Sequence, residues 1–473
     1  MKIMLFAPEM TLLLGGLALF LLSIGKNTAR LARPLALAVA LATFGASLFS
    51  LRAEGFLFFD SYKIDLFSQV LKLILSGGLA CVLLFGKELK DIAEEIRPEY
   101  YMFLCLSTLG LVMLVSSVEL VTLFIALELS SYSLYLLVPM REERPGLRMQ
   151  MESAIKYILF GVVATAVMLF GMSYLYGLTG TTYFAGLIPA LRTMMDSPAA
   201  LAGIAMVMGG FFFKLAVFPF HFWVPDVYQG ASNETTAFIS SVPKVAAVAM
   251  LIRIAAMATS EGHHLTSMLA IFAVLSMFYG NLVALVQTDI KRMLGFSGIA
   301  HAGYVLLGIV TLQEVGYATS LYYITGYLAM NVAGFLVICT VSQNGENLQI
   351  SDLSGLHKRS PLMAFTLAVS MFALAGLPPF AGFMGKFMLL TGAYKAGYLP
   401  LVIIAAVNTA ISIYYYLSVV RVTYAAGGDK TETINASASA KALSVGLVLL
   451  ILALGLAPDM LMRLATDAVK SIL

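Results

Sequence analysis

Four ionisable side chains lie inside runs of sequence that are otherwise almost entirely apolar. Glu128 is near the centre of one run, and Lys214, Lys244 and Lys386 lie in three others. An ammonium in the middle of a bilayer costs roughly 2.5 to 3.5 kcal/mol on insertion scales, so such residues face a polar interior and mark paths for ions or protons. Amines and a carboxylate can take up and release protons. We therefore expect acid–base chemistry.

The first lysine lies in the run GGFFFKLAVFPFHFWVPDVYQGASNETTAFISSVPK, residues 209–244. If its helix starts near residue 200, Lys214 lies roughly 20 Å along it, close to the middle of the bilayer. Pro219 follows five residues later and frees backbone carbonyls at the same depth. Such a break is tolerated only where protein or water receives the carbonyls. The run therefore predicts a discontinuous helix beside an internal polar path.

A second segment, from Leu362 to about Ala396, repeats this arrangement. It would be roughly 50 Å long if it were one helix, far longer than a bilayer core. Pro378 and Pro379 lie within it, and Lys386 follows them. Adjacent prolines break a helix. The segment therefore predicts a second discontinuous helix that carries a lysine.

The composition indicates the elements that hold these residues. The chain has 473 residues, of which 60% are hydrophobic and only 12% charged, with a mean hydropathy of +0.91. These values exclude a soluble domain. Apolar runs of about 17 to 23 residues predict an all-α integral membrane protein with about fourteen transmembrane helices. The runs are centred near residues 14, 42, 76, 109, 129, 166, 211, 248, 277, 304, 330, 378, 411 and 449. The first run lacks a small-residue cleavage site and is expected to be a retained helix.

The order of these helices predicts two repeats. Helices 4 to 8 and helices 9 to 13 make two groups of five, and the fourth helix of each group is broken and carries a lysine. Because five is odd, the second group is inverted in the membrane, the plan in which ion sites lie at interrupted helices. The predicted parts are an N-terminal three-helix group at 1–98, the first repeat at 99–262, the inverted second repeat at 263–424, and a C-terminal loop and helix at 425–473.

The distribution of basic residues predicts the orientation. Sixteen of the 29 lysines and arginines fall in loops after odd-numbered helices, seven lie on the opposite side, and six are inside helices. Loops rich in lysine and arginine face the cytoplasm. We therefore expect both termini on the periplasmic side, and Lys291 and Arg292 at the cytoplasmic surface.

Several function classes are not supported by the sequence. Cys81, Cys105 and Cys339 are isolated in apolar runs, and the five histidines show no ligand spacing. We therefore expect no metal site, haem or iron–sulfur cluster in this chain. No glycine-rich phosphate loop is present, so no nucleotide cofactor is expected in this chain. We also expect no nucleic-acid partner.

For other charged residues a structural interpretation competes with a functional one. Lys72 either takes part in function or packs against a carboxylate. Glu9 and Lys156 lie near helix ends, where side chains can extend to the lipid headgroups, the interpretation we favour for Glu9. Lys156 is also a candidate partner for Glu128. Arg253 is expected to reach the far membrane interface.

His301 is a further candidate on the tenth predicted helix. A lone histidine is usually satisfied by packing and a hydrogen bond, but it can also carry protons near neutral pH. We keep His301, with Lys156 and Lys72, as a possible accessory to the four residues named first.

Several motifs taken together resemble a known family. They are the helix that carries Glu128 and the runs FKLAVFPFHFWVPDVYQGA, SVPKVAA, TDIKRMLGFSGIAHAGY and GLPPFAGFMGKF. These resemble the antiporter-like membrane subunits of bacterial respiratory complex I, and PDVYQGA is most similar to the subunit N branch. The resemblance covers essentially the whole chain.

The resemblance implies a proton channel in the bacterial inner membrane. Glu128 and Lys214 would form a pair, Lys244 would be the central relay, and Lys386 the exit group. It also implies that partner subunits handle NADH, flavin, iron–sulfur clusters and quinone, and that this chain lies in the lipid bilayer beside other antiporter-like subunits. The chain departs from the family pattern after Ala231, where the usual proline-containing sequence is replaced by Ser232, Asn233 and Glu234. Glu234 could add a proton-collecting charge on the cytoplasmic side.

Two alternatives stay open at this stage. The chain could be a cation/proton antiporter subunit without redox partners, which co-purifying subunits would reveal. It could also be a passive scaffold whose buried charges only specify helix pairing, in which case lysine-to-methionine changes would alter assembly but not the ratio of protons to electrons.

Overall fold

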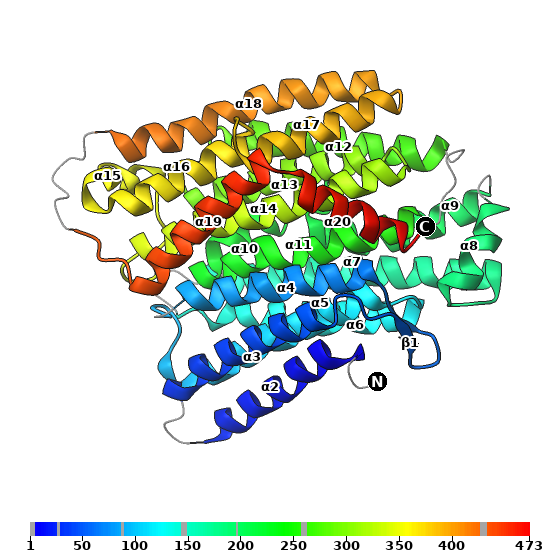
Figure 1. Cartoon of the computed structure of the whole chain (residues 1–473), viewed down its shortest axis with the longest axis horizontal. Coiled ribbons are helices and arrows are strands. Elements are labelled where there is room, and N and C mark those ends of the chain that lie inside the picture. The colour runs from blue at the N-terminus through cyan, green and yellow to red at the C-terminus, as the bar shows by residue number, and fades with distance from the viewer. Residues whose placement is uncertain are drawn as a thin grey trace.

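Long helices that lie side by side along the long axis of the molecule make up most of the chain (Figure 1). They are seen in a computed structural model that describes residues 5–25, 29–86, 89–142, 149–194, 197–256, 263–425 and 433–473. The first half contains α2 (Ala7–Ile24), α3 (Ala29–Phe49), α4 (Leu66–Phe85), α5 (Arg97–Ser116), α6 (Leu120–Leu137), α7 (Met149–Thr179), α8 (Phe184–Arg192), α9 (Pro198–Leu215), α10 (Val224–Gly230) and α11 (Asn233–Ala255). The second half contains α12 (His263–Ala284), α13 (Ile290–Ile309), α14 (Glu314–Val341), α15 (Leu356–Arg359), α16 (Pro361–Ala375), α17 (Ala381–Lys395), α18 (Leu399–Tyr424), α19 (Ala438–Leu456) and α20 (Asp459–Lys470).

The predicted membrane fold is confirmed. Among the described residues, twelve helices are long and apolar enough to cross a membrane. The other two predicted spans correspond to α13 and to the broken pair of α16 and α17. The count of fourteen spans therefore stays a prediction. Helices α8 and α20, which are too short to cross a membrane, were not predicted from the sequence.

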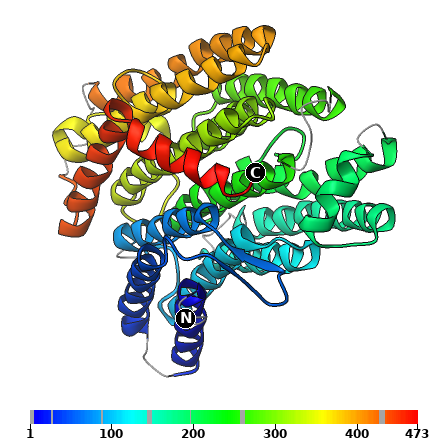
Figure 2. The ribbon, with the colours of Figure 1, turned by 45° about the vertical axis from the view of Figure 1, so that its right-hand side comes forward.

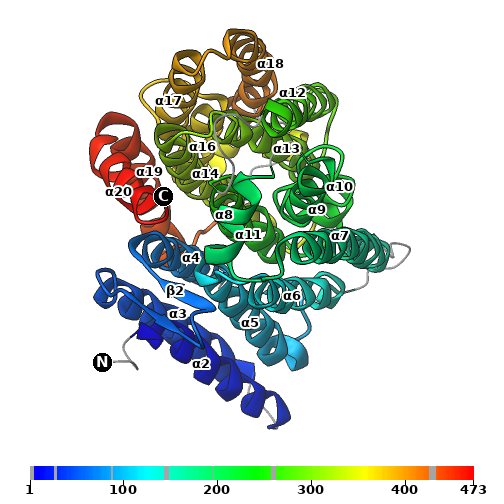
Figure 3. The ribbon, with the colours of Figure 1, turned by 90° about the vertical axis from the view of Figure 1, so that its right-hand side faces the viewer.

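Two helices lie in the middle of the bundle when it is viewed along its long axis (Figure 3). They are α11, which is buried along its whole length, and α14, which is almost entirely buried. A helix that is apolar on all sides can be surrounded by other helices, and α11 contacts α4, α5, α9, α13 and α14. The N-terminal helices α2 and α3 lie at one edge of the bundle, and α17 and α18 lie at the opposite edge (Figure 2). A buried charge on α11 is thus shielded from lipid.

Both predicted helix breaks are present, and they are built alike. Helix α9 ends at Leu215, and Ala216 then takes a left-handed conformation with a φ of 69° before the chain passes Pro219. Helix α16 ends at Ala375, and Gly376 takes the same conformation with a φ of 88° before the two prolines. A left-handed residue after the last helical one reverses the chain and ends the helix. One break thus lies in each predicted five-helix group, and the inversion of the second group stays a prediction.

Different segments of the chain lie at the two ends of the bundle. At one end, here called the Arg253 end, the strands β1 (Gly55–Leu57) and β2 (Tyr62–Ile64) form an antiparallel hairpin that the sequence analysis missed. The C-terminal segment also lies at this end, where Lys63 Nζ donates to the carbonyl of Ser471 over 3.1 Å. The N-terminal helix begins there too, since Phe6 packs against Phe58 of the hairpin. The opposite end, here called the Arg141 end, holds the loop that precedes α11.

Candidate functional site

Lys214 is buried one residue before the end of α9, at the first break. Its ammonium donates to the hydroxyls of Ser130 and Ser131 on α6, over 3.1 and 3.0 Å. Two serines in succession on a membrane helix are the signal that could have identified these partners. The position of the lysine thus follows from the sequence, whereas its neutral partners were not predicted.

Glu128 lies on α6, two residues before the first of these serines. Its Oε1 accepts a hydrogen bond from Thr165 Oγ1 on α7, over 2.9 Å. Glu128 acts electrostatically on Lys214, yet no ion pair between the two is found among the described residues. The structure therefore brings the two predicted partners near one another without direct contact, each satisfied by hydroxyl groups.

Lys244 lies on the central helix α11, directly after Pro243, through which the helix continues. Its Nζ is 5.5 Å from the centre of the Tyr327 ring and 6.0 Å from that of Tyr228. A Cβ at Gly298 of α13 would lie only 2.7 Å from this Nζ, so the glycine lets the ammonium come close to α13. The described residues offer the buried Lys244 Nζ no hydrogen-bond partner. The aromatic faces attract the ammonium instead.

His301 on α13 is hydrogen-bonded through both ring nitrogens. Nδ1 lies 2.6 Å from the Tyr323 hydroxyl, and Nε2 lies 3.0 Å from the Tyr416 hydroxyl. The ring centre is also 4.9 Å from that of Tyr327. Both Lys244 and Lys386 act electrostatically on this histidine. His301 therefore lies between the central lysine and the lysine of the second broken helix.

Lys386 on α17 turns back to the break that precedes it. Its Nζ donates to the carbonyls of Leu374 and Ala375, over 3.2 and 3.0 Å. These carbonyls belong to the end of α16, where backbone acceptors lack intrahelical partners and carry the negative end of the helix dipole. The ammonium also lies 4.7 Å from the centre of the Tyr304 ring. The break thus supplies acceptors for the charge that follows it.

Buried tyrosines surround Lys244, His301 and Lys386, and they were not predicted from the sequence. They come from α13, α14 and α18 and are Tyr304, Tyr323, Tyr327 and Tyr416. The spacing of four residues between Tyr323 and Tyr327 places both on one face of a helix, which is a detectable signal. It is weak, because aromatic residues at this spacing are more often ordinary core.

Lys156 does not contact Glu128. Its Nζ lies 2.7 Å from a carboxylate oxygen of Asp226 on α10 and 2.7 Å from one of Glu152. Arg292 of α13 binds the other oxygen of Asp226 over 2.9 Å. Asp226 therefore joins residues of the two repeats, and Lys156 belongs to this partly exposed network.

The expectation that Glu9 extends to the headgroups is wrong. Glu9 and Lys72 are both completely buried, and Lys72 Nζ lies 2.7 Å from Glu9 Oε1. The same oxygen accepts a hydrogen bond from the Tyr62 hydroxyl over 2.5 Å. Burial and pairing across α2 and α4 hold Glu9 in the protein. The packing interpretation of Lys72, against a carboxylate, is the one observed.

Two predicted surface cations are also buried. Arg253 lies in the last turn of α11, at the far end of the helix as expected, but its guanidinium is buried and binds both carboxylate oxygens of Asp65 over 3.0 Å. Burial alone would raise the pKa of Asp65, but Arg253 and a hydrogen bond from the backbone N–H of Ser68 outweigh it and hold that pKa below its usual value. Lys291 is fully buried as well, where its Nζ donates to the carbonyl of Ala231 over 2.9 Å. Acceptors from distant segments explain why both side chains are buried.

Comparisons with known proteins agree on one family. The profile of the family described as "NADH:quinone oxidoreductase/Mrp antiporter, TM" matches residues 117–412. NADH-quinone oxidoreductase subunit N 2 of Opitutus terrae is 53% identical over 424 residues, which cover 90% of this chain and 88% of that protein. A chain of respiratory complex I from Thermus thermophilus superposes with a TM-score of 0.84 at 30% identity, covering 97% of this chain and 99% of that one. A chain of the Mrp complex from Dietzia sp. has a TM-score of 0.88 at 20% identity, covering 99% of this chain and 97% of that one, and shares the fold.

Proposed function

This chain belongs to the family of membrane subunits that NADH:quinone oxidoreductases share with Mrp antiporters, and we propose that it translocates protons across the inner membrane as a subunit of NADH-quinone oxidoreductase. Other membrane subunits of that complex are its partners. The chain performs acid–base chemistry only, and electron transfer from NADH to quinone takes place in partner subunits.

The observation that carries the proposal is a run of buried proton-carrying groups between Lys244 and Lys386, part of which is hydrogen-bonded. Lys244 lies against Tyr327, whose ring packs on His301. His301 is hydrogen-bonded to the hydroxyls of Tyr323 and Tyr416. The second of these acts electrostatically on Tyr304, whose ring lies beside Lys386. A proton can pass along such a run by rotation of hydroxyl groups and through internal water, which buried polar groups without protein partners retain.

Lys214 and Glu128 control the supply of protons to this run. Burial disfavours a charged amine, and a nearby carboxylate favours it. When Glu128 approaches Lys214, the lysine keeps its proton, and when Glu128 stays with Thr165, as here, the proton can leave toward Lys244. Because one tenfold change in a proton equilibrium corresponds to about 1.4 kcal/mol, a movement of a few ångströms between these groups is enough to gate transfer.

We assign the Arg141 end to the cytoplasm and both termini to the periplasmic side. The assignment uses the excess of lysine and arginine in the loops after odd-numbered helices, sixteen against seven. Protons then leave on the side of the Arg253 end.

The test is Lys214→Met in the complete complex, reconstituted into vesicles, with the ratio of protons pumped to electrons transferred as the readout. We expect this ratio to fall while quinone reduction continues. The matched control is Lys395→Met, which removes an exposed lysine at the end of α17 and should leave the ratio unchanged. Full pumping by Lys214→Met would remove Lys214 from the path. Co-purification of NADH- and quinone-handling chains separates this function from that of an antiporter without redox partners.

A further inference from the structure

Glu234 lies in the first turn of the central helix α11, and it is only 6% exposed. Charged residues from two other segments act electrostatically on its carboxyl group: Asp91 and Lys90, which precede α5, and Lys291 at the start of α13. The carboxyl group in turn acts electrostatically on Tyr100, Tyr101 and Cys339. A carboxyl group is thus held inside the protein at the Arg141 end, on the helix that carries Lys244.

The neighbouring cations are bound to other acceptors. Lys90 Nζ donates to the carbonyl of Ser342 over 2.7 Å, and Lys291 Nζ donates to the carbonyl of Ala231 over 2.9 Å. Apart from its own backbone N–H, the Glu234 carboxyl group has no hydrogen-bond or ion-pair partner among the described residues. A carboxylate that no cation holds in contact can take up a proton without breaking an ion pair.

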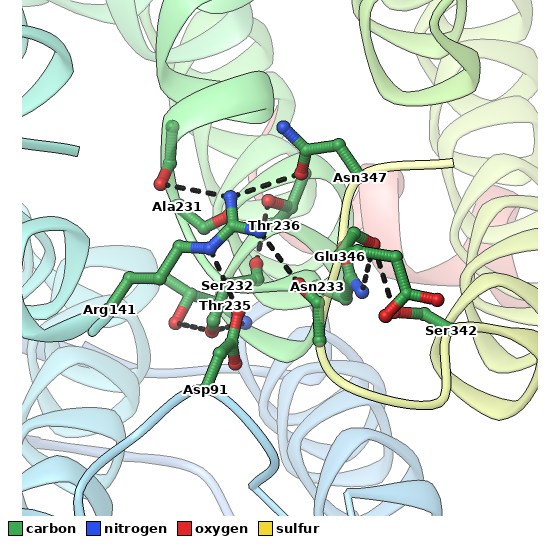
Figure 4. Close-up of polar contacts among 12 residues, drawn as sticks. Asp91, Arg141, Ala231, Ser232, Asn233, Thr235, Thr236, Ser342, Glu346 and Asn347 are labelled. Atoms are coloured by element: carbon green, nitrogen blue, oxygen red, sulfur yellow. Dashed lines mark hydrogen bonds and ion pairs between the residues drawn. The ribbon is translucent and has the colours of Figure 1, made fainter. Parts of the chain in front are cut away.

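Arg141 fixes the loop directly before Glu234 (Figure 4). Its Nε lies 2.9 Å from a carboxylate oxygen of Asp91, and its Nη1 donates to the carbonyl of Ala231 over 3.2 Å and to Asn347 Oδ1 over 3.0 Å. Figure 4 shows these contacts converging from three segments on the start of α11. The loop is therefore held in place, and the position of Glu234 is set by it.

A cavity of about 230 Å³ opens beside this loop. Arg141, Gly230, Glu346 and Asn347 are among its lining residues. The residue before Glu234 borders the same place, since Asn233 Nδ2 donates to the carbonyl of Glu346 over 3.4 Å. A cavity of this size with charged and amide side chains in its lining can hold several water molecules. Water can thus approach the start of α11 from the Arg141 end.

Lys244 lies on the same side of α11 as Glu234, nearer the C-terminal end of the helix. Ser241 follows Glu234 by seven residues and precedes Lys244 by three, so the three side chains lie along one side of the helix. The distance from Glu234 to Lys244 along the axis is roughly 15 Å, and the long lysine side chain shortens it because helical side chains lean toward the N-terminus. Ser241 donates its hydroxyl hydrogen to the carbonyl of Ala237, which leaves its oxygen free to accept a proton.

We propose that Glu234 is a second proton-uptake group of this chain, which takes protons from the cavity at the Arg141 end and passes them along α11 to Lys244, in addition to the supply that Lys214 and Glu128 control. This inference rests on the proposed function. A proton from water binds the Glu234 carboxylate, then leaves the neutral acid through water and the Ser241 hydroxyl, and binds the neutral amine of Lys244. Each transfer leaves the donor ready to be protonated again from the cavity.

The test compares Glu234→Gln, Glu234→Asp, Lys244→Met and the double variant E234Q/K244M in the complete complex in vesicles. The readout is the ratio of protons pumped to electrons transferred, measured on preparations in which this chain co-purifies in normal amount. We expect E234Q to lower the ratio, the double variant to go no lower than K244M alone, and E234D to restore most of the loss seen in E234Q. Glu314→Gln, which removes a carboxylate at the Arg253 end, is the control and should change nothing.

Two results would overturn the inference alone. One is a normal ratio in E234Q together with a lowered ratio in K244M, and the other is a ratio in E234D as low as in E234Q, which would mean that a carboxyl group is not what matters. A normal ratio in both E234Q and K244M would instead contradict the proposed function. The comparison of E234Q with K244M thus separates failure of the uptake group from failure of the relay.

Discussion

The buried pair of Lys72 and Glu9 gives the most direct energetic test. We predict that Lys72→Met strongly destabilises the protein, whereas the double variant E9Q/K72M is close to wild type in stability. The reason is that the single change leaves a carboxylate inside the bundle without its cation. Tyr62, which donates to the same carboxylate oxygen, is unchanged in both variants.

The magnitude follows from the geometry. At the observed 2.7 Å, two unit charges attract with about 6 kcal/mol if the effective dielectric constant is about 20. Transfer of both charges from water offsets most of this gain, so the pair as a whole is worth little. Removing one partner of a fully buried pair costs about 3 to 5 kcal/mol. In E9Q/K72M the glutamine oxygen still accepts the hydrogen bond from Tyr62, so we expect a loss of about 1 kcal/mol or less.

The assay is a titration of the purified chain in detergent micelles with sodium dodecyl sulfate, followed by circular dichroism. The coupling energy between the two sites is the free energy of unfolding lost by the two single variants minus that lost by the double variant. We expect about 3 kcal/mol or more. Lys470→Met is the matched control, because its ion pair with Glu314 is exposed and 3.7 Å long, and such pairs contribute about 0 to 1 kcal/mol.

A loss below about 1 kcal/mol in Lys72→Met would contradict the burial argument. So would a double variant as unstable as the single one. The same double variant also tests function, because a structural pair predicts a normal ratio of protons to electrons in the assembled complex. A lowered ratio would instead support Lys72 as an accessory residue of the relay.

Three further changes test the breaks, a buried carboxylate and the relay. Gly376→Ala should lower the free energy of unfolding by about 1 to 2 kcal/mol in the same titration, because alanine is strained at a φ of 88°, whereas Ala216→Gly should not lower it. Because the folded state lowers the pKa of Asp65, its stabilisation is full well above the unfolded pKa of about 3.9 and is lost as the pH falls through the lower folded value, so the stability gap between wild type and Asp65→Asn should close in acid. Ser131→Asp should hold the proton on Lys214 and lower pumping as much as Lys214→Met does, whereas Ser131→Asn should pump.

The sequence predicts the membrane helices and both breaks because these depend on local properties. The length of an apolar run determines whether it can span the membrane, and a proline determines where a helix ends. Lys214 and Lys386 are therefore placed correctly relative to their breaks from the sequence alone. The roles of the four relay residues stay predictions at this level.

The partners of the charges could not be predicted, because they come from segments far apart in the chain. Asp65 meets Arg253 across 188 residues. Glu9 was misjudged because its depth along one helix suggested the interface, while its actual surroundings depend on the packing of α2 against α3 and α5 and on the hairpin. The tyrosines around His301 were not predicted for the same reason. In the sequence they are indistinguishable from ordinary core residues, and only the packing of three helices brings them together.

The contacts nevertheless suggest a rule that distinguishes structural from relay cations in this protein. The structural cations contact buried carboxylates, in the pairs Lys72 with Glu9, Arg141 with Asp91, and Arg253 with Asp65. The relay lysines contact neutral groups among the described residues: hydroxyls at Lys214, aromatic rings at Lys244, and backbone carbonyls at Lys386. A cation that loses its proton beside a carboxylate leaves a buried negative charge, whereas one beside neutral groups leaves none. Among these six residues proton loss is therefore inexpensive only at the second set, and these are the lysines to which the path is assigned.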